Sequence, residues 1–242
     1  RLTRQIFNPN PWAITTDVEI YHAPAVAGVV SLTFVDDAGQ EMPSQILSEL
    51  RHPRYAGSIN DQHNLVRVDL PALGYRTVTI VESPDKPIEQ ARPANVFLET
   101  GDLRLEFSAD ALRSITDLAS GREVRSENGA VLPGLTFHEL DDQNWISIGP
   151  EIGRHRFEPS ESAWVQHGPL RWQHRSRGQV GPYQATVDLL IPDKGREIEM
   201  RVRLEGHWAS APQTGWVTLL MPVAAECAIT VDVPFGVEAR DP

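Results

Sequence analysis

The chain has 242 residues, with 33 acidic against 22 basic residues and a net charge of −11. It contains no Lys/Arg-rich run, which argues against a nucleic-acid partner. Hydrophobic residues make up 40% and charged residues 23%, a balance typical of a globular protein that can bury a core. The longest apolar runs, such as VDLLIP and VTLLMPV, are far shorter than a membrane span, so no membrane partner is expected.

The single cysteine, Cys227, bears on the cellular compartment. One thiol forms neither an intramolecular disulfide nor a thiolate metal cluster. The opening segment RLTRQIFNPNPW has no apolar signal core. These features favour a reducing compartment, and we expect a cytoplasmic location. Because the sequence opens without methionine, directly in strand-like residues, we also expect the chain to have been cut from a longer protein.

Alternation of apolar and polar residues is the main secondary-structure signal along the chain. It is clear in NLVRVDL at 64–70, DLRLEF at 102–107 and EIEMRVRLE at 197–205. Strict period 2 is typical of half-buried antiparallel strands. The apolar face of each run is predicted to consist of Val66, Val68 and Leu70; of Leu103, Leu105 and Phe107; and of Ile198, Met200, Val202 and Leu204.

Turn signals separate these runs. Gly39 and Gly121 stand where the strand pattern reverses and a positive φ is needed. HGPL at 167–170 separates two strand-like runs, and PDKG at 192–195 is predicted to close a hairpin. The best helix candidate is SQILSELRH at 44–52, which is short and weakly capped.

The predicted organisation is all-β, with two domains. Residues 1–82 are expected to form a small immunoglobulin-like β-sandwich of about seven strands. Residues 83–93 lie in a Pro-rich stretch, a composition typical of an extended linker. Residues 94–242 are expected to form a larger antiparallel β domain.

The segment FHELDDQNWISIG at 137–149 brings a histidine, three carboxylates and a tryptophan into a short stretch. One interpretation makes His138 a base or ligand beside a carboxylate pair drawn from Glu139, Asp141 and Asp142. The other makes the segment a polar loop after a strand, with Trp145 packed on the sandwich. The acids lack the fixed helical spacing of a metal motif such as H-E-x-x-H, which favours the loop.

The histidines suggest a second kind of chemistry. A mutarotase needs a histidine and a glutamate on opposite sides of a sugar ring, one to remove a proton and one to supply it. His155 with Glu151, or His167 with Glu161, are candidate pairs by residue type. The alternative is that all four are exposed strand or loop residues.

The tryptophans and three arginines are open to structural and functional interpretations. Tryptophan rings either stack on sugars or fill core and interfaces, and burial is the more frequent case. The set comprises Trp12, Trp145, Trp164, Trp172, Trp208 and Trp216. Arg171, Arg175 and Arg177 alternate along one stretch, which places them on one face predicted to be solvated. Contact of that face with another domain is the alternative.

The ordered set of motifs resembles glycoside hydrolase family 38, the α-mannosidase family. IFNPNPW at 6–12, DDAGQEMPSQI at 36–46 and VDLPALGYRTVTI at 68–80 are similar to the family's small β-sandwich. FLETGDLRLEFSADALRSITDLASGREV at 97–124 resembles the opening hairpins of its large C-terminal β domain. DDQNW, WVQHGPLRWQHR and PFGVEAR follow in the order that the family shows. The resemblance covers nearly the whole chain.

The resemblance implies an accessory role. Family 38 enzymes are retaining glycosidases whose catalytic aspartate and zinc ligands lie in an N-terminal α/β domain, which no part of this chain matches. It therefore implies that this chain holds no catalytic residue, metal ligand or cofactor, and that zinc belongs to the missing domain. The implied partners are that catalytic domain of the same polypeptide and carbohydrate, in mannose metabolism.

For the larger domain, the resemblance implies part of a galactose-mutarotase-like supersandwich. Because the family's catalytic carboxylates lie elsewhere, the resemblance favours a structural loop at 137–149. The alternative is that this loop faces the sugar groove from the side, with His138, Asp141, Asp142 and Trp145 as candidate carbohydrate contacts. Two alternatives remain at the level of function: a free-standing carbohydrate-binding module and a mutarotase-like sugar epimerase. Fold analogy does not choose among them, because function depends on sites grafted on folds.

Overall fold

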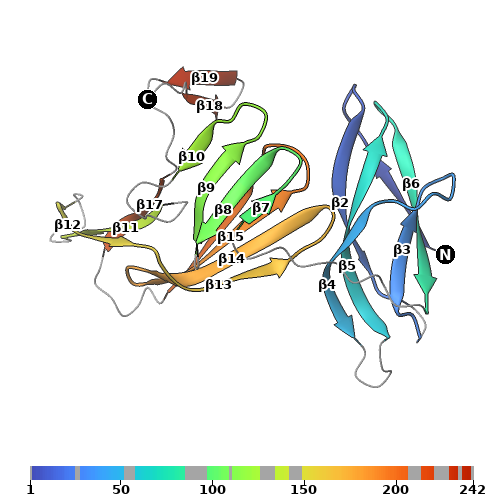
Figure 1. The fold of residues 1–242 in the computed structure, drawn as a ribbon, viewed down its shortest axis with the longest axis horizontal. Helices are drawn as coiled ribbons and strands as arrows, with labels where there is room; N and C mark the ends of the chain where they lie inside the picture. The colour runs from blue at the N-terminus through green and yellow to red at the C-terminus, as the bar shows by residue number, and fades with distance from the viewer. Residues whose placement is uncertain are drawn as a thin grey trace. The chain divides into compact units, whose positions relative to one another are not determined.

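The computed structural model describes residues 2–24, 28–51, 58–84, 97–108, 111–125, 134–141, 149–206, 214–220, 229–233 and 236–240. Throughout these ranges the regular secondary structure is β-strand, and the strands pair antiparallel in several sheets (Figure 1). The predicted all-β class is confirmed. No helix long and apolar enough to cross a membrane is found among the described residues.

The chain divides into two compact units. The first comprises residues 1–93, 164–173 and 190–194, and the second comprises 94–163, 174–189 and 195–242. The first unit therefore includes two segments from far along the sequence, which no local pattern indicated.

The first unit contains two three-stranded sheets, with the orders β1-β6-β3 and β2-β5-β4 (Figure 1). Its buried core draws on both sheets, which defines a β-sandwich. Val66, Val68 and Leu70 lie in this core, as their alternation predicted. The strands are β1 (Leu2–Phe7), β2 (Ile14–His22), β3 (Ser31–Val35), β4 (Ser44–Arg51), β5 (Ile59–Leu70) and β6 (Tyr75–Ser83).

The weak helix candidate at 44–52 is not a helix where the structure describes it, because residues 44–51 form strand β4. β4 pairs with β5, from Ser44 opposite Val66 to Arg51 opposite Ile59, with register shifts between Ile46 and Ser48 and between Leu50 and Arg51. These irregularities interrupt the strict alternation that marks a strand in the sequence. Pairing with β5 supplies the backbone hydrogen bonds that a short, weakly capped helix would have to supply alone.

Buried polar side chains fix the distant segments in the first unit. The carbonyl of the Gln45 side chain accepts hydrogen bonds from the backbone N–H groups of Leu170 (3.2 Å) and Arg171 (2.8 Å). The Gln45 amide donates to the backbone carbonyl of Arg171 at 2.7 Å. Gln166 donates to the carbonyl of Leu47 at 2.9 Å. Buried polar groups are stable only when paired in this way.

The second unit contains the sheets β10-β9-β8-β7, β12-β11-β17 and β18-β19. A four-stranded sheet, β13-β14-β15-β16, contributes residues to both units. The strands are β7 (Phe97–Glu99), β8 (Leu103–Ser108), β9 (Ala111–Asp117), β10 (Glu123–Arg125), β11 (Gly134–Leu140), β12 (Glu151–Arg156), β13 (Glu158–Gln166), β14 (Arg171–Val180), β15 (Tyr183–Pro192), β16 (Glu199–Glu205), β17 (Thr214–Leu220), β18 (Ile229–Val233) and β19 (Gly236–Arg240).

Of the two alternating runs predicted in the second unit, one buries its apolar face and the other does not. Leu103, Leu105 and Phe107 are buried, as predicted. Within the run at 197–205, residues 199–205 form β16, but Val202 and Leu204 are each 37% exposed. β16 lies at the end of its sheet order, where one side has no neighbouring strand among the described residues. The predicted strand is therefore confirmed, and its predicted burial is not.

The predicted turns are found. Gly39 and Gly121 have φ angles of 78° and 69°, the left-handed region that favours glycine. Residues 167–170 separate β13 from β14, and 192–195 include the end of β15 and the turn toward β16. These positions were readable because the residue type itself meets the backbone requirement.

The expected solvated arginine face is partly wrong. Arg175 forms a bidentate pair with Asp188 at 2.7 and 2.9 Å, and both side chains are mostly covered. Arg171 is mostly buried and lies 3.5 Å from Glu19 in the first unit. Arg177, 3.7 Å from Glu161, remains exposed. Acids from other strands thus pair with these arginines, a relation that one strand's pattern does not reveal.

Candidate functional site

The candidate site is built on β11, the central strand of the sheet β12-β11-β17 in the second unit. β11 carries His138 and Glu139, which are consecutive residues and therefore point to opposite faces of the sheet. The neighbouring strands place one partner beside each: Trp216 stands opposite His138 on β17, and His155 stands on β12 beside Glu139.

On one face, His138 makes three contacts. Its ring stacks on Trp216, with centroids 5.3 Å apart and an interplanar angle of 20°. Nδ1 lies 3.1 Å from a carboxylate oxygen of Glu151, and Nε2 lies 2.8 Å from the hydroxyl of Thr218. A carboxylate only accepts, so a neutral His138 carries its proton on Nδ1 and accepts from Thr218 at Nε2.

Glu151 is the charged centre of this face. Arg154 and His138 both donate to its carboxylate. These hydrogen bonds, from Arg154 first and His138 second, hold the pKa of Glu151 below its ordinary value. The same contact raises the pKa of Arg154. Glu151 is therefore a carboxylate at neutral pH, suited to accept hydrogen bonds and unsuited to donate a proton as a general acid.

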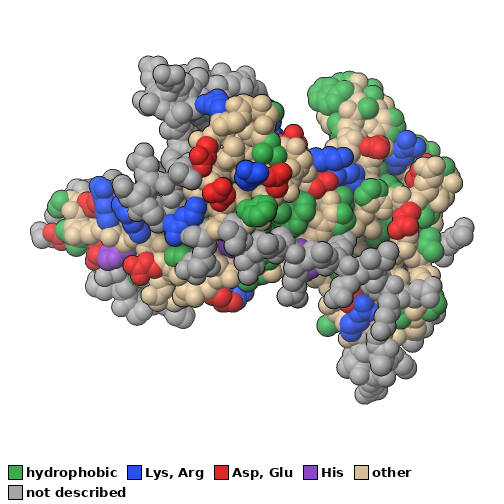
Figure 2. All heavy atoms as spheres, viewed as in Figure 1, with side chains coloured by type: hydrophobic (Ala, Val, Ile, Leu, Met, Phe, Trp, Pro, Cys, Tyr) green, Lys and Arg blue, Asp and Glu red, His purple; other side chains and the backbone are tan. Residues whose placement is uncertain are grey.

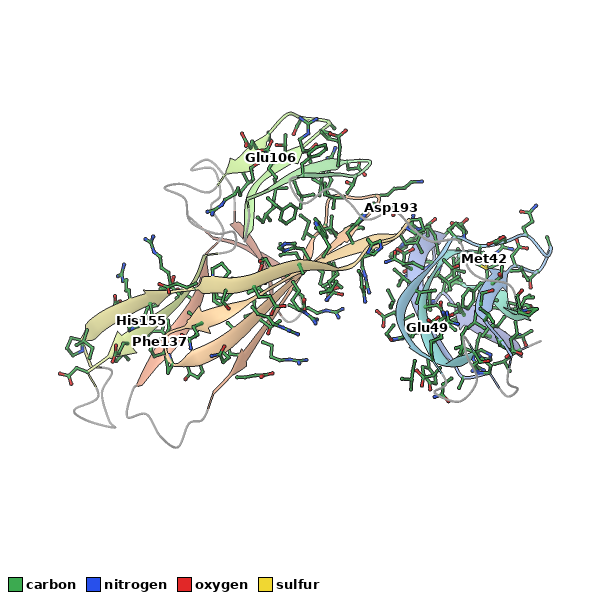
Figure 3. All side chains as sticks on the ribbon, turned by 60° about the horizontal axis from the view of Figure 1, so that its bottom comes forward. Met42, Glu49, Glu106, Phe137, His155 and Asp193 are labelled. Carbon is green, nitrogen blue, oxygen red and sulfur yellow. The ribbon has the colours of Figure 1, made fainter. Side chains whose placement is uncertain are left out.

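On the other face, Glu139 accepts a hydrogen bond from Nε2 of His155 at 2.9 Å. The His155 ring lies 6.0 Å from that of buried Phe137, and Figure 3 shows these two side chains together on neighbouring strands. Gly153 lies opposite Glu139, and a Cβ there would lie 3.0 Å from the Glu139 carboxylate and 3.3 Å from His155 Nε2. The absence of a side chain at Gly153 makes room for this pair.

This geometry limits the chemistry of the site. Each imidazole is hydrogen-bonded directly to a carboxylate, which leaves no space for a sugar ring between the two groups of a pair. A mutarotase reaction needs an acid and a base on opposite sides of the ring. Glu139 and Glu151 belong to opposite faces of the sheet, so they do not flank one glycosidic bond as a retaining mechanism requires.

The histidine–glutamate pairs differ from those suggested by the sequence. Glu151 contacts His138 and Arg154, and His155 contacts Glu139. Glu161 lies 3.7 Å from Arg177. Residue type alone identified the right kinds of side chain and the wrong partners, because strand register decides which residues meet.

Of the predicted sugar-contact residues, His138 and Asp141 fall within the described residues. His138 is in the site, and the backbone N–H of Asp141 donates to the carbonyl of Pro150 at 3.0 Å, just beyond β11. Asp142 and Trp145 lie outside the described residues. Trp216 and Thr218 were not singled out together with His138, because they are about 80 residues away along the sequence.

The described residues do not fit a zinc site. Within these ranges, no three His, Cys, Asp or Glu side chains are grouped so as to hold a metal ion. The His–Glu pairs of β11 offer two donors each, on separate faces, whereas zinc sites in proteins use three or four ligands.

Comparison with known proteins bears on the fold. No family model matches the sequence, and no curated protein matches it. An α-mannosidase structure from Enterococcus faecalis V583 matches with a TM-score of 0.60 and 13% identity, over 98% of this chain and 33% of that one. A glycosyl hydrolase family 38 protein from Enterococcus faecalis matches with a TM-score of 0.62 and 11% identity, over 98% and 35%.

The chain therefore has the fold of a part of these family 38 structures. It spans about a third of their length. This confirms the structural resemblance predicted from the order of the sequence motifs. Structural matches at 11–13% sequence identity show that the fold is shared, and they do not show that the activity is shared.

Proposed function

We propose that this chain is a non-catalytic β-sandwich portion of an α-mannosidase-type retaining glycosidase. The observation that carries the proposal is the pair of fold matches, which cover 98% of this chain and a third of the matched structures. Its role is to support and flank an active-site groove built by a separate catalytic α/β domain of the same polypeptide. That domain supplies the catalytic carboxylates and zinc.

The site on β11 supports this proposal. Its two carboxylates lie on opposite faces of a sheet, and each is already hydrogen-bonded to an imidazole. We also propose a cytoplasmic location for this chain, since one cysteine in 242 residues suits a reducing compartment.

The first experiment is to sequence the native gene upstream of the codon for Arg1 and downstream of the codon for Pro242. An adjoining α/β domain with an aspartate nucleophile and a zinc-binding motif is the expected result. A frame that closes at both ends without such a domain would overturn the proposal.

A second experiment assays the isolated chain. We expect no hydrolysis of 4-nitrophenyl α-mannoside, with or without added zinc. Glu139→Gln and the exposed Glu199→Gln serve as matched variants. Turnover by the purified chain that Glu139→Gln abolishes and Glu199→Gln leaves intact would make this chain a catalyst in its own right.

Carbohydrate binding is the second candidate function, and Trp216 favours it. Trp216 is 41% exposed and stacks on His138, which also contacts the carboxylate of Glu151, the partner of Arg154. An exposed, rigid aromatic ring beside charged hydrogen-bonding groups is suited to contact the face of a sugar. The test is calorimetric titration with mannosides: Trp216→Ala should abolish the heat of binding, whereas Trp12→Ala should not. No heat with the wild-type chain would exclude this function.

A further inference from the structure

One end of the first unit carries a cluster of exposed apolar side chains, Phe7, Trp12, Leu73 and Tyr75, here called the apolar patch. Their exposed fractions are 61%, 61%, 64% and 59%. They come from the end of β1, the β1–β2 loop, the β5–β6 turn and the start of β6. Figure 2 shows hydrophobic side chains gathered at this end of the unit. Large apolar side chains that are grouped and exposed mark interaction surfaces more often than single ones do.

Hydrogen bonds hold the members of the patch close together. Phe7 and Tyr75 are direct partners in the β1–β6 register. The side chain of Asn8, which is fully buried, donates to the carbonyls of Trp12 at 2.8 Å and Pro71 at 2.9 Å. The loop and the turn are therefore fixed to each other through Asn8, and the patch is preformed.

Leu73 shows that this exposure is built into the backbone. Its φ is +47°, the left-handed region that a leucine rarely adopts, and its N–H donates to the carbonyl of Asn10 at 2.8 Å. The next residue, Gly74, has no room for a side chain, because a Cβ there would lie 2.7 Å from Pro71. The turn thus holds its bulkiest apolar side chain in water, although burying that side chain would be more favourable. A strained turn that exposes an apolar side chain indicates a surface for a partner.

The composition of the patch favours a protein partner. Residues 7–14 and 70–75 contain no charged residue, in a chain with 23% charged residues. Protein interface cores are enriched in aromatic residues and depleted of charge. A sugar site needs polar groups in addition to aromatic rings, and the buried Asn8 amide is already bonded to the backbone. An anionic membrane surface attracts Lys and Arg, which both segments lack.

We propose that the apolar patch is the docking surface for another domain of the same polypeptide. That domain corresponds to a part of the matched structures outside the third that this chain covers. The matched structures are about three times as long as the matched region, so such a protein has ample chain to cover the patch. This inference rests on the proposed function, because it takes its partner from the same longer polypeptide.

The first test is hydroxyl-radical footprinting of this chain alone and within its longer polypeptide. Oxidation of Trp12, Phe7 and Tyr75 should fall at least about fivefold in the longer protein, since an interface core excludes solvent. Rates measured in denatured samples calibrate the intrinsic reactivity of each side chain. Equal rates in the two proteins would overturn the proposal.

The second test uses Leu73→Asn, with Leu50→Asn as the matched control. Leu50 is also exposed, at 55%, but lies in strand β4. Asparagine adopts a positive φ more readily than leucine, so Leu73→Asn should raise the melting temperature of the isolated chain by about 2 °C. In the longer protein the same variant should lower it, because the docked leucine is lost. Leu50→Asn should shift both proteins equally.

The outcomes separate this inference from the proposed function. A longer protein with mannosidase activity and an unprotected patch would overturn the docking surface alone. A reading frame without a further domain would overturn both. Protection of Trp12 that grows with the concentration of the isolated chain would assign the patch to a second copy. Protection by lipid vesicles would assign it to a membrane, and each of these results would also overturn the docking proposal.

Discussion

The guanidinium of Arg67 lies 2.6 Å from the carboxylate of Asp193, which is 126 residues further along the chain. The same guanidinium also contacts both carboxylate oxygens of Asp17, at 2.8 and 2.9 Å. Both carboxylates, Asp193 first and Asp17 second, raise the pKa of Arg67 further above its already high ordinary value. One planar fork thus pairs with an acid from β2 and one from the turn after β15 within the first unit, a geometry that arginine supports and lysine does not.

Arg67→Ala should lower the free energy of unfolding by about 2–4 kcal/mol, since it leaves two largely covered carboxylates without their cation. Arg67→Lys should recover part of that loss, because it restores the charge but not the two bidentate contacts. Urea denaturation measures both variants.

The control for Arg67 is Arg201→Ala. Arg201 pairs with Glu199, and both side chains are more than half exposed. Its replacement should change the stability by less than about 0.5 kcal/mol. Equal losses for Arg67→Ala and Arg201→Ala would mean that the Asp17–Arg67–Asp193 arrangement contributes no more than a surface ion pair.

Gly181→Ala should destabilise the protein more than Gly39→Ala, although both glycines have a positive φ of 56° and 78°. At Gly39 a Cβ meets no atom within 4 Å, so the cost is backbone strain of about 1–2 kcal/mol. At Gly181 a Cβ would lie 2.4 Å from the ring of buried Phe137, which adds about 1–3 kcal/mol.

Thermal unfolding of the two glycine variants separates strain from packing. The difference between their melting temperatures mainly reports the clash with Phe137, since both glycines lie in the left-handed region. Phe137→Leu in the Gly181→Ala background should recover part of the loss, because the smaller side chain leaves room for the methyl group. Equal melting temperatures for the two alanine variants would show that the ring moves aside freely.

The strand positions were predictable because their signal is local. In NLVRVDL and DLRLEF each apolar residue sits two positions from the next, and the pleat alone then determines which side chains face the core. Gly39 and Gly121 were equally readable, because a turn with positive φ selects for glycine. The fold resemblance followed from the order of such signals along the chain.

The contacts of the site were not predictable from one sequence. His138 meets Trp216 and Thr218 because β11 pairs with β17 in one register, and a shift of one residue would turn Trp216 to the other face. Arg67 meets Asp193 by the same kind of long-range placement. Nothing local in either segment encodes its partner, so the sequence identified residue types and left the pairs undetermined.

The pKa of Glu151 should lie below its ordinary value of 4.5, and Arg154 should account for more of the shift than His138. Arg154→Ala is therefore expected to raise the pKa of Glu151 further than His138→Gln does. Carbon-detected NMR titration of the side-chain carboxyl measures both changes. A larger effect of His138→Gln would mean that His138, held in place by its stack on Trp216, is the main partner of this carboxylate. Arg154 would then be the lesser partner.

His174 should make the stability of the protein fall in mild acid. The ring is buried, 4.7 Å from that of Phe107. Burial lowers its pKa from 6.5 to about 4, against a smaller opposing effect of Asp188. The unfolded chain therefore binds this proton near pH 6.5, whereas the folded protein binds it near pH 4. The contribution of His174 is fully present above pH 6.5 and is lost as the pH falls through about 4.

The loss reaches roughly 3 kcal/mol once the pH is below both values. His174→Gln removes the titrating group, so its unfolding free energy should decline less between pH 7 and pH 4 than that of the wild type. Urea denaturation at several pH values gives both curves, and their difference cancels the other titrating residues. A constant difference across that range would mean that water reaches the His174 ring in the folded protein and hydrates its charged form.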